Sequence, residues 1–262
     1  MKLLTTLLRR LRDGVIVLWA AASLTFLGVQ HSGGDTALAI LGGPDAMPTP
    51  EMLAQVRAEY GLDQPLWLQY GHYLARLAKG DLGESYRLRI PVGQAIGEQV
   101  GATLALASSA AVLAVLIALV SALLTANRGR RLRAWVSGIE LVLSSTPNFV
   151  IGTVLLLAFA FYFHLLPPSG SRGWRSLVLP TLALALPVAA VLAQVLRQSL
   201  EQVLEQPFIT QARARGMSDT AVRLRHALRH ALVPLVTLAG YVFASLLGGA
   251  VVLELLLSLI HI

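Results

Sequence analysis

The sequence predicts an all-α membrane protein with about five transmembrane helices, an external helical segment and a cytoplasmic helical loop. Of the 262 residues, 55% are hydrophobic and only 13% are charged, with a mean hydropathy of +0.67. Soluble domains are about a quarter charged, and here the charges cluster so that long runs carry none. The net charge of +7 is explained by Lys and Arg at the cytoplasmic membrane surface rather than by nucleic acid. Because the chain has no cysteine, disulfides and cysteine-ligated metal or redox sites are excluded.

Five apolar runs are the candidate transmembrane helices. A helix needs about 20 apolar residues to cross ~30 Å of hydrocarbon, and the last four runs meet this length. Glu140 is the single charge in the third run, and Glu254 is the single charge in the fifth. The runs are Gly14–Val29, Ala102–Ala126, Trp135–Phe163, Leu177–Leu196 and Ala231–Leu257.

The first run is short and has two interpretations. A cleaved signal peptide is one, because Lys2 and three arginines precede the run. However, the small residues Ala20–Ala22 lie in its middle and no A-x-A motif follows it. We therefore favour an uncleaved first transmembrane helix.

The distribution of Lys and Arg predicts the orientation of the helices, since these residues are enriched in cytoplasmic loops. Four basic residues precede the first run, four lie in the loop 127–134, and the segment 197–230 is rich in arginine. The segment 30–101 instead has five basic residues against eight acidic ones. We therefore expect the N-terminus, 127–134 and 197–230 in the cytoplasm. Alternation then places 30–101 and 164–176 outside.

Two domains are predicted, residues 1–101 and residues 102–262. The first holds the first transmembrane helix and the external helical segment, and the second holds the other transmembrane helices. In the external segment, Thr49 is a possible N-cap of a helix over Glu51–Tyr60, and Gly61 suits its C-terminal end.

A second external helix is predicted over Pro65–Leu77, with an apolar stripe that includes Trp67, Tyr70 and Tyr73. The stripe either packs against the membrane or the protein's own helices, or receives a soluble partner. We favour packing. The glycines at 93, 97 and 101 then predict a tight helical start of the second transmembrane helix.

A polar patch interrupts the third apolar run around Pro147. A proline inside a helix removes one hydrogen bond and kinks the helix, and nearby hydroxyls can satisfy the freed carbonyl. Pro187 has the same effect in the fourth run. The patch either lines a solute path or is a packed helix kink, and both interpretations stay open. The candidate pathway residues are Ser144, Ser145, Thr146, Asn148 and, in the fourth run, Gln194.

The segment 197–230 carries signals for two short helices that lie along the membrane face. Pro207 suits the first turn of one helix, and Gly216 suits the position just after its end. Ser218 is a good N-cap for the next helix, and Asp219 favours its positive end. Pro234 then follows at the start of the fifth run. The enrichment of Lys and Arg in cytoplasmic loops explains the arginines of this segment, but it does not explain the order of helix-capping residues.

This segment carries a resemblance to a known family. TQARARGMSDTAVRLRHALRHALVP, from Thr210 to Pro234, resembles the cytoplasmic loop of binding-protein-dependent ABC importer permeases, in the dipeptide, oligopeptide and nickel branch. The family pattern is E-A-A, three residues, then glycine. Ala212 and Gly216 match it, whereas Thr210 and Gln211 depart from its first two letters. PTPEMLA, YGLDQPLWLQY, KGDLGES, LLPPSG and LVLPTLALALP are also similar to that branch.

The resemblance implies half of a solute channel in the bacterial inner membrane. It implies a second permease subunit, two ATPase subunits that use the ATP, an external solute-binding protein, and no cofactor on this chain. The helix around Gly216–Leu228 would couple to the ATPase, while the arginines contact either the ATPase or lipid phosphates. The coupling residues would be Thr210, Gln211, Ala212, Arg213, Arg215, Gly216, Ser218, Asp219, Arg223 and Arg225.

The resemblance also bears on the solute and on the chain's end. Dipeptides, oligopeptides, nickel and related small solutes are all allowed, and PTPEMLA followed by GLDQPL and QYG slightly favours nickel. Family members continue after the position of Glu254 with an aromatic residue, P-G and a sixth helix. We therefore expect a C-terminally truncated chain with a foreign tail from about Leu255, since Ser258–Ile262 resembles translated adapter sequence.

Other classes of protein remain as alternatives, namely an intramembrane enzyme or a membrane assembly anchor. The sequence has no G-x-x-x-x-G-K-[ST], H-E-x-x-H or G-x-S-x-G motif. His226 and His230 have the spacing of metal ligands on a helix, but they lack a third ligand nearby and are interpreted as interfacial. Glu254 is either a proton or ion site or a structural hydrogen-bonding group.

Overall fold

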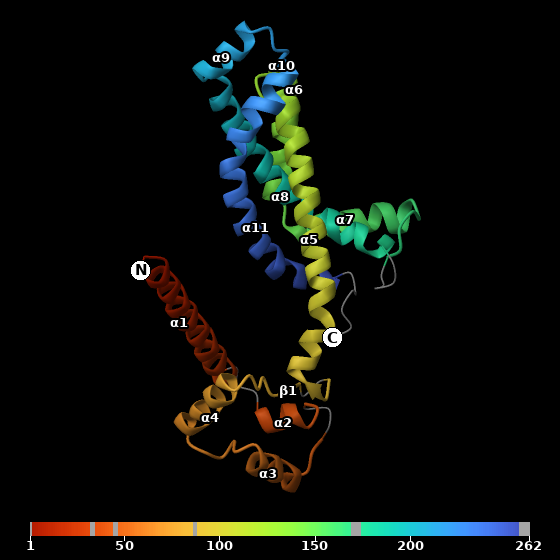
Figure 1. The fold of residues 1–262 in the computed structure, drawn as a ribbon. Coiled ribbons are helices and arrows are strands. Elements are labelled where there is room, and N and C mark those ends of the chain that lie inside the picture. Colours follow the sequence, from red (N-terminus) through yellow and green to blue (C-terminus); the bar gives the residue numbers. More distant parts are fainter. Residues whose placement is uncertain (1, 32–34, 44–46, 86–87, 169–173, 257–262) are drawn as a thin grey trace. The chain divides into compact units, whose positions relative to one another are not determined.

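The computed structural model describes residues 2–31, 35–43, 47–85, 88–168 and 174–256, and in this part nearly every element is a helix (Figure 1). The chain divides into two compact units, Met1–Glu98 and Gln99–Ile262. The predicted foreign tail lies almost entirely outside the described residues, as does the side chain of Glu254.

The N-terminal unit begins with the 30-residue helix α1 (Lys2–His31), which contains the first apolar run. Three further helices follow, α2 (Thr36–Ile40), α3 (Pro50–Glu59) and α4 (Leu66–Ala78), and a short antiparallel pair joins β1 (Glu84–Ser85) to β2 (Ile90–Pro91). The predicted caps of α3 are confirmed. Thr49 Oγ1 accepts from the Met52 amide at 3.4 Å, and Gly61 has a φ of +65°.

Helix α4 packs its aromatic residues on α1. The Tyr70 and Tyr73 rings lie 5.4 and 5.6 Å from the ring of Phe26, and the Tyr70 and Ser23 hydroxyls are 2.6 Å apart. The packing interpretation is therefore right for these two tyrosines, whereas Trp67 is exposed. At the N-cap of α2, a hydrogen bond from Arg57 holds the pKa of the Asp35 carboxyl below its usual value.

Helix α5 (Val92–Thr125) contains the second apolar run except for its last residue, Ala126. A Cβ added at Gly93, Gly97 or Gly101 would meet no other atom within 4 Å, so no close helix contact in the described residues explains this glycine spacing. Close packing lies further along α5 instead, where small residues recur every three or four positions and are fully buried. They are Ala107, Ala110, Ala114, Ala118 and Ala122.

The third apolar run is broken rather than kinked. Helix α6 (Arg130–Ser145) and the helix formed by α7 (Asn148–Leu155) and η2 (Leu156–Tyr162) differ in direction by 107°. Because proline disfavours helical backbone in the residue before it, Thr146 is extended, with φ −93° and ψ 129°. The predicted change of direction at Pro147 is confirmed, but the 107° bend is a break between two helices rather than a kink within one.

Helix α8 (Trp174–Leu204) is the most buried helix of the C-terminal unit. It packs against α6, α7 and α11 (Leu228–Leu256), and it stays helical through Pro180 and Pro187. Its buried leucines join the alanines of α5 in one core. Within the described residues, four helices are long and apolar enough to cross a membrane, or five if the bent pair is one span, which confirms the all-α membrane class.

Candidate functional site

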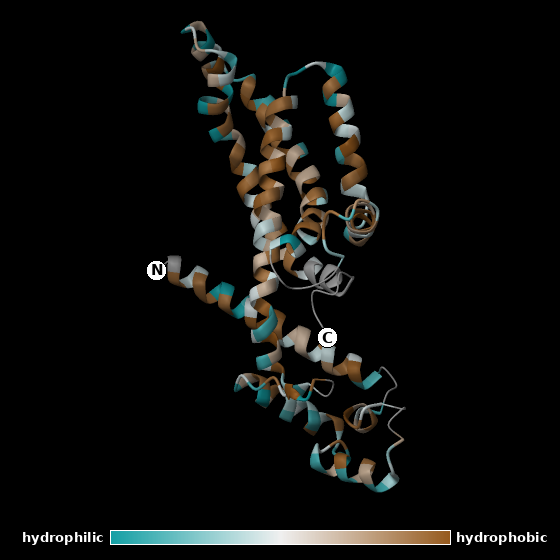
Figure 2. Cartoon of the chain, turned by 90° about the vertical axis from the view of Figure 1, so that its right-hand side faces the viewer, coloured by the Kyte–Doolittle hydropathy of each residue, from teal (hydrophilic) through white to brown (hydrophobic). Residues whose placement is uncertain are grey.

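Helix α9 (Pro207–Ala214) presents one face to the protein and one to solvent. Pro207 occupies its first turn, and Ile209 and Ala212 are buried in the core. Thr210, Gln211, Arg213 and Ala214 are exposed. Hydrophilic residues gather at this end of the C-terminal unit (Figure 2).

A tight turn ends α9 at Gly216, where φ is +83°. The Gly216 amide donates to the Arg213 carbonyl at 2.9 Å, and the Met217 amide donates to the Ala212 carbonyl at 3.3 Å. This pair of bonds is the Schellman motif, which needs a left-handed residue at the glycine position. A Cβ there would meet nothing within 4 Å, so backbone conformation rather than space requires glycine.

The helix after this turn starts as predicted but does not end as predicted. Ser218 Oγ accepts from the Ala221 amide at 3.3 Å and caps α10 (Asp219–Ala221). The helix then continues through η3 (Val222–Ala227) into α11 without a break, so the expected second short helix is the start of the fifth transmembrane helix. No glycine or proline lies between Asp219 and Val233 to interrupt it.

Arg223 and Asp219 together join this helix to α5 and α9. The Arg223 side chain is buried, its Nε donates to Asp219 at 2.7 Å, and its Nη1 donates to the Ala126 carbonyl at 2.7 Å. That carbonyl belongs to the C-terminal end of α5, where carbonyls lack helical partners and a positive charge is favourable. Asp219 also accepts from Arg213 at the end of α9, at 3.2 Å.

The remaining predicted coupling residues surround this cluster. Gln211, Arg215, Ser218 and Arg225 are exposed, whereas Ala212 is buried. The structure therefore brings Arg213, Asp219 and Arg223 together, buries Ala212 in the core and leaves the others on the surface.

The polar patch surrounds the α6–α7 break. The Ser144 hydroxyl donates to the Leu141 carbonyl, and the Thr146 hydroxyl donates to the Val142 carbonyl at 2.7 Å, as expected for a helix end near proline.

The other three predicted pathway residues lie on α6, α7 and α8. Asn148 is half-buried and lies near α11, since a Cβ added to Gly249 would be 3.6 Å from the Asn148 Nδ2. Ser145 is exposed on α6. Gln194 is exposed on α8, and among the described residues no hydrogen bond joins it to the patch.

Sequence reasoning missed a buried polar network between α5, α6 and α8. Arg197 Nη2 pairs with Glu140 Oε2, and Arg197 Nη1 donates to Ser137 Oγ at 2.6 Å. Ser121 Oγ donates to the other oxygen of Glu140 at 2.7 Å. The side chains of Arg197 and Glu140 are only 4% and 6% exposed. Glu140 was the sequence feature that could have indicated this network. It is the single charge in an apolar run, and such a charge requires a hydrogen-bonding or ionic partner.

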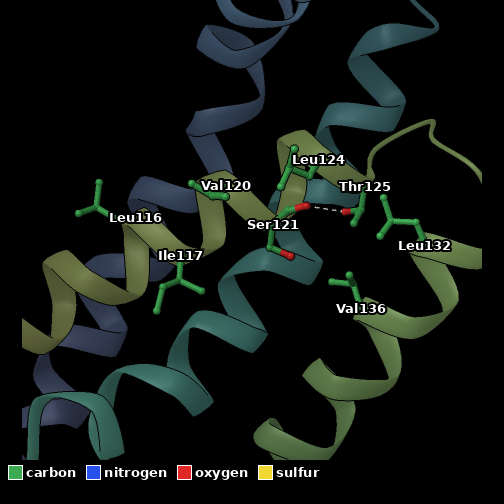
Figure 3. A pocket seen from close by; sticks show the side chains of 8 residues that line it. All are labelled: Leu116, Ile117, Val120, Ser121, Leu124, Thr125, Leu132 and Val136. Atoms are coloured by element: carbon green, nitrogen blue, oxygen red, sulfur yellow. Dashed lines mark hydrogen bonds between the residues drawn. The ribbon is translucent and has the colours of Figure 1, made fainter. Parts of the chain in front are cut away.

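Ser121 of this network borders an apolar groove of about 490 Å³ between α5 and α6 (Figure 3). Figure 3 also shows Thr125, whose hydroxyl donates to the Ser121 carbonyl at 2.6 Å. The other side chains that line the groove are Leu116, Ile117, Val120, Leu124, Leu132 and Val136. Because they are aliphatic, the groove suits lipid chains or packed side chains rather than a polar ligand.

The two histidines of the segment 197–230 have separate environments. The His230 ring lies 5.2 Å from the Phe208 ring, and His226 Nδ1 is buried without a hydrogen-bond partner. Among the described residues no three metal-binding side chains form a group.

Comparison with known proteins agrees with this architecture. Residues 110–259 match the family model "Binding-protein-dependent transport system inner membrane component", and residues 3–107 match the model of its N-terminal part. The chain is 35% identical to the glutathione transport system permease protein GsiC of Escherichia coli O6:H1, over 96% of this chain and 82% of the relative. The proteins of the same name from E. coli K12 and Salmonella choleraesuis are 34% and 36% identical over the same shares. The chain therefore belongs to the binding-protein-dependent transport system inner membrane components, the permease subunits of ABC importers.

Proposed function

We propose that this chain forms half of the solute pathway of an importer and that a second permease subunit supplies the other half. Two separate ATPase subunits bind the surface formed by α9 and the turn at Gly216, and they use the ATP. An external solute-binding protein delivers the solute to the opposite side of the membrane. The N-terminus, the α5–α6 turn and α9 lie in the cytoplasm of the bacterial cell, because their basic residues favour that side.

The observation that carries this proposal is the bracing of α9. Its exposed face is available to a partner, while its buried face and the Arg223 cluster tie it to α5 and α11. ATP can drive alternating access only if the ATPase contacts differ between the two states of the permease. A shift of that equilibrium from 1:99 to 99:1 needs about 5.5 kcal/mol of differential contact. A braced helix transmits such a displacement, whereas a loose loop absorbs it.

The proposed solute is a short peptide of the glutathione class. The relatives named above are glutathione permeases, and they resemble this chain over nearly its whole length. These relatives support a peptide as the solute. The motifs PTPEMLA, GLDQPL and QYG of the external segment instead favour nickel. The test measures the uptake of labelled glutathione and of Ni(II) in cells that express the full transporter. Uptake of glutathione supports the peptide, and uptake of Ni(II) alone contradicts it.

The test of ATPase coupling is Gly216→Val in the assembled transporter. A β-branched residue in left-handed backbone costs roughly 1–2 kcal/mol or more, so the turn after α9 rearranges and its exposed face moves. We expect at least a tenfold loss of ATPase co-purification or of uptake.

Gly80→Val is the matched control for this test. Gly80 ends α4 with the same two backbone bonds, a φ of +78° and no atom within 4 Å of an added Cβ. The Gly80→Val variant therefore introduces the same backbone strain at a position that is distant from α9 in the sequence. Equal losses in both variants, or unchanged uptake in Gly216→Val, would contradict the coupling assignment. A wild-type chain that assembles without any ATPase would instead support an assembly anchor.

A further inference from the structure

The Arg197–Glu140 network lies between α9, where the proposed function places the ATPase contact, and the polar patch, which is a candidate for lining the solute path. Arg197 lies on α8, and only two residues separate the end of α8 from α9. Glu140 lies on α6, one helical turn before Ser144 and the α6–α7 break. An α-helix is stiff over such distances, so a displacement of α9 reaches Arg197 through α8. A displacement of Glu140 in turn reaches the polar patch through the last turn of α6.

The chemistry of the network fits a mechanical role better than a stabilising one. A buried ion pair is often no more stable than an apolar pair of similar volume, because both charges must leave water. Removal of a single partner is harmful, since it leaves one buried charge alone. The pair therefore holds α6 and α8 in a fixed register, and any movement of one helix without the other separates opposite charges in an apolar environment.

The network also joins α5 to this pair. Ser121 of α5 donates to the second oxygen of Glu140, and Ser137 of α6 accepts from Arg197. Both terminal nitrogens of the Arg197 guanidinium, a rigid fork of donors, are thus held by side chains of α6. A movement of α5 or α8 relative to α6 therefore stretches at least one of these contacts.

We propose that Arg197 and Glu140, with Ser121 and Ser137, form a strut that transmits the movement of α8 and α9 to the α6–α7 break. These are positioning residues for coupled transport, and the inference rests on the function proposed above. Without the strut, ATP hydrolysis continues but no longer moves the polar patch. The specific expectation is loss of coupling, measured as glutathione molecules transported per ATP hydrolysed.

The main test uses the complete transporter in proteoliposomes, with its ATPase and a glutathione-loaded binding protein. The double variant Glu140→Leu with Arg197→Met replaces the ion pair by apolar side chains of similar size. We expect normal ATPase binding and ATP hydrolysis, with at least a tenfold lower ratio of transport to hydrolysis. A wild-type ratio in this variant would overturn the proposal, because it would show that the pair only fills the core.

Ser121→Ala decides the question if the double variant fails to assemble. It removes the hydroxyl that donates to Glu140 but leaves the ion pair, and we expect a two- to fivefold lower ratio. Ser109→Ala is the control, because Ser109 is also a half-buried α5 serine and its hydroxyl lies 3.0 Å from Thr181 of α8. Equal ratios in the two serine variants would overturn the strut. Failure of the wild-type chain to bind an ATPase would instead overturn the function on which the strut rests.

Discussion

Arg223 is a residue whose role differs from its expected surface role. Sequence reasoning left the arginines of the segment 197–230 free to contact an ATPase or lipid phosphates. The structure instead buries Arg223 between Asp219 and the Ala126 carbonyl. Arg225, two residues later, is exposed and remains suited to an external contact. The two arginines therefore have different roles: Arg223 stabilises the fold, and Arg225 is available to bind a partner.

Replacement of Arg223 by methionine tests this separation. Arg223→Met keeps much of the aliphatic stem but leaves the Ala126 carbonyl without its donor and Asp219 without its closest cation. Hydrogen bonds to charged groups contribute about 1.5–3 kcal/mol, so we expect about 2 kcal/mol of destabilisation. Thermal unfolding of the purified protein in detergent measures the effect. The control Arg225→Met should unfold at the wild-type temperature, and an equal shift in both variants would refute a bracing role for Arg223.

Among the elements, α5 packs through a line of fully buried alanines. Ala118 is fully buried, and Val112 of the same helix is 60% exposed. We expect Ala118→Leu to cost about 1–3 kcal/mol, because extra methylene groups in a close-packed core force neighbouring helices apart. Val112→Leu adds one methylene on the exposed face and should be neutral. Thermal unfolding of both variants checks the difference, and a neutral Ala118→Leu would show that α5 packs loosely.

Local signals explain which elements could be predicted from the sequence. The caps at Thr49, Gly61, Gly216 and Ser218 were predictable because each depends on residues within one turn of the chain. The break at Pro147 was not, since a proline permits either a kink or a break. The packing of α7 on α8 and α11 accompanies the observed 107° bend. The sequence pattern therefore predicted that the helix changes direction but not by how much.

Long-range pairs explain what sequence reasoning missed in the candidate site. Arg197 and Glu140 are 57 positions apart, and Arg223 is 97 positions from the carbonyl that it binds. No local pattern relates residues at such separations. Glu140 alone indicated that a partner must exist, because an unpaired charge in an apolar helix is costly. Arg197 was assigned to the loop because it is the first charge after the fourth apolar run, although it lies within α8.

For the molecule as a whole, the orientation in the membrane is the property on which both proposals depend. The ATPase surface must face the cytoplasm, so the exposed residues of α9 and of the α5–α6 turn must lie on one side, and those of α3 on the other. The chain has no cysteine, so a single introduced cysteine reports its own position without a background signal. Gln55 of α3, Arg131 in the first turn of α6, directly after the α5–α6 turn, and Gln211 of α9 are exposed and sample these three regions.

We expect a membrane-impermeant maleimide to label Gln55→Cys in intact cells. Arg131→Cys and Gln211→Cys should react only after the membrane is permeabilised. Because bound ATPase can shield Gln211, the Arg131 variant gives the independent measurement on the same side. Uptake by each variant verifies that the labelled protein is folded. Labelling of Arg131→Cys in intact cells would place the arginine-rich turn outside, and neither the ATPase surface nor a strut that begins at α9 is compatible with that arrangement.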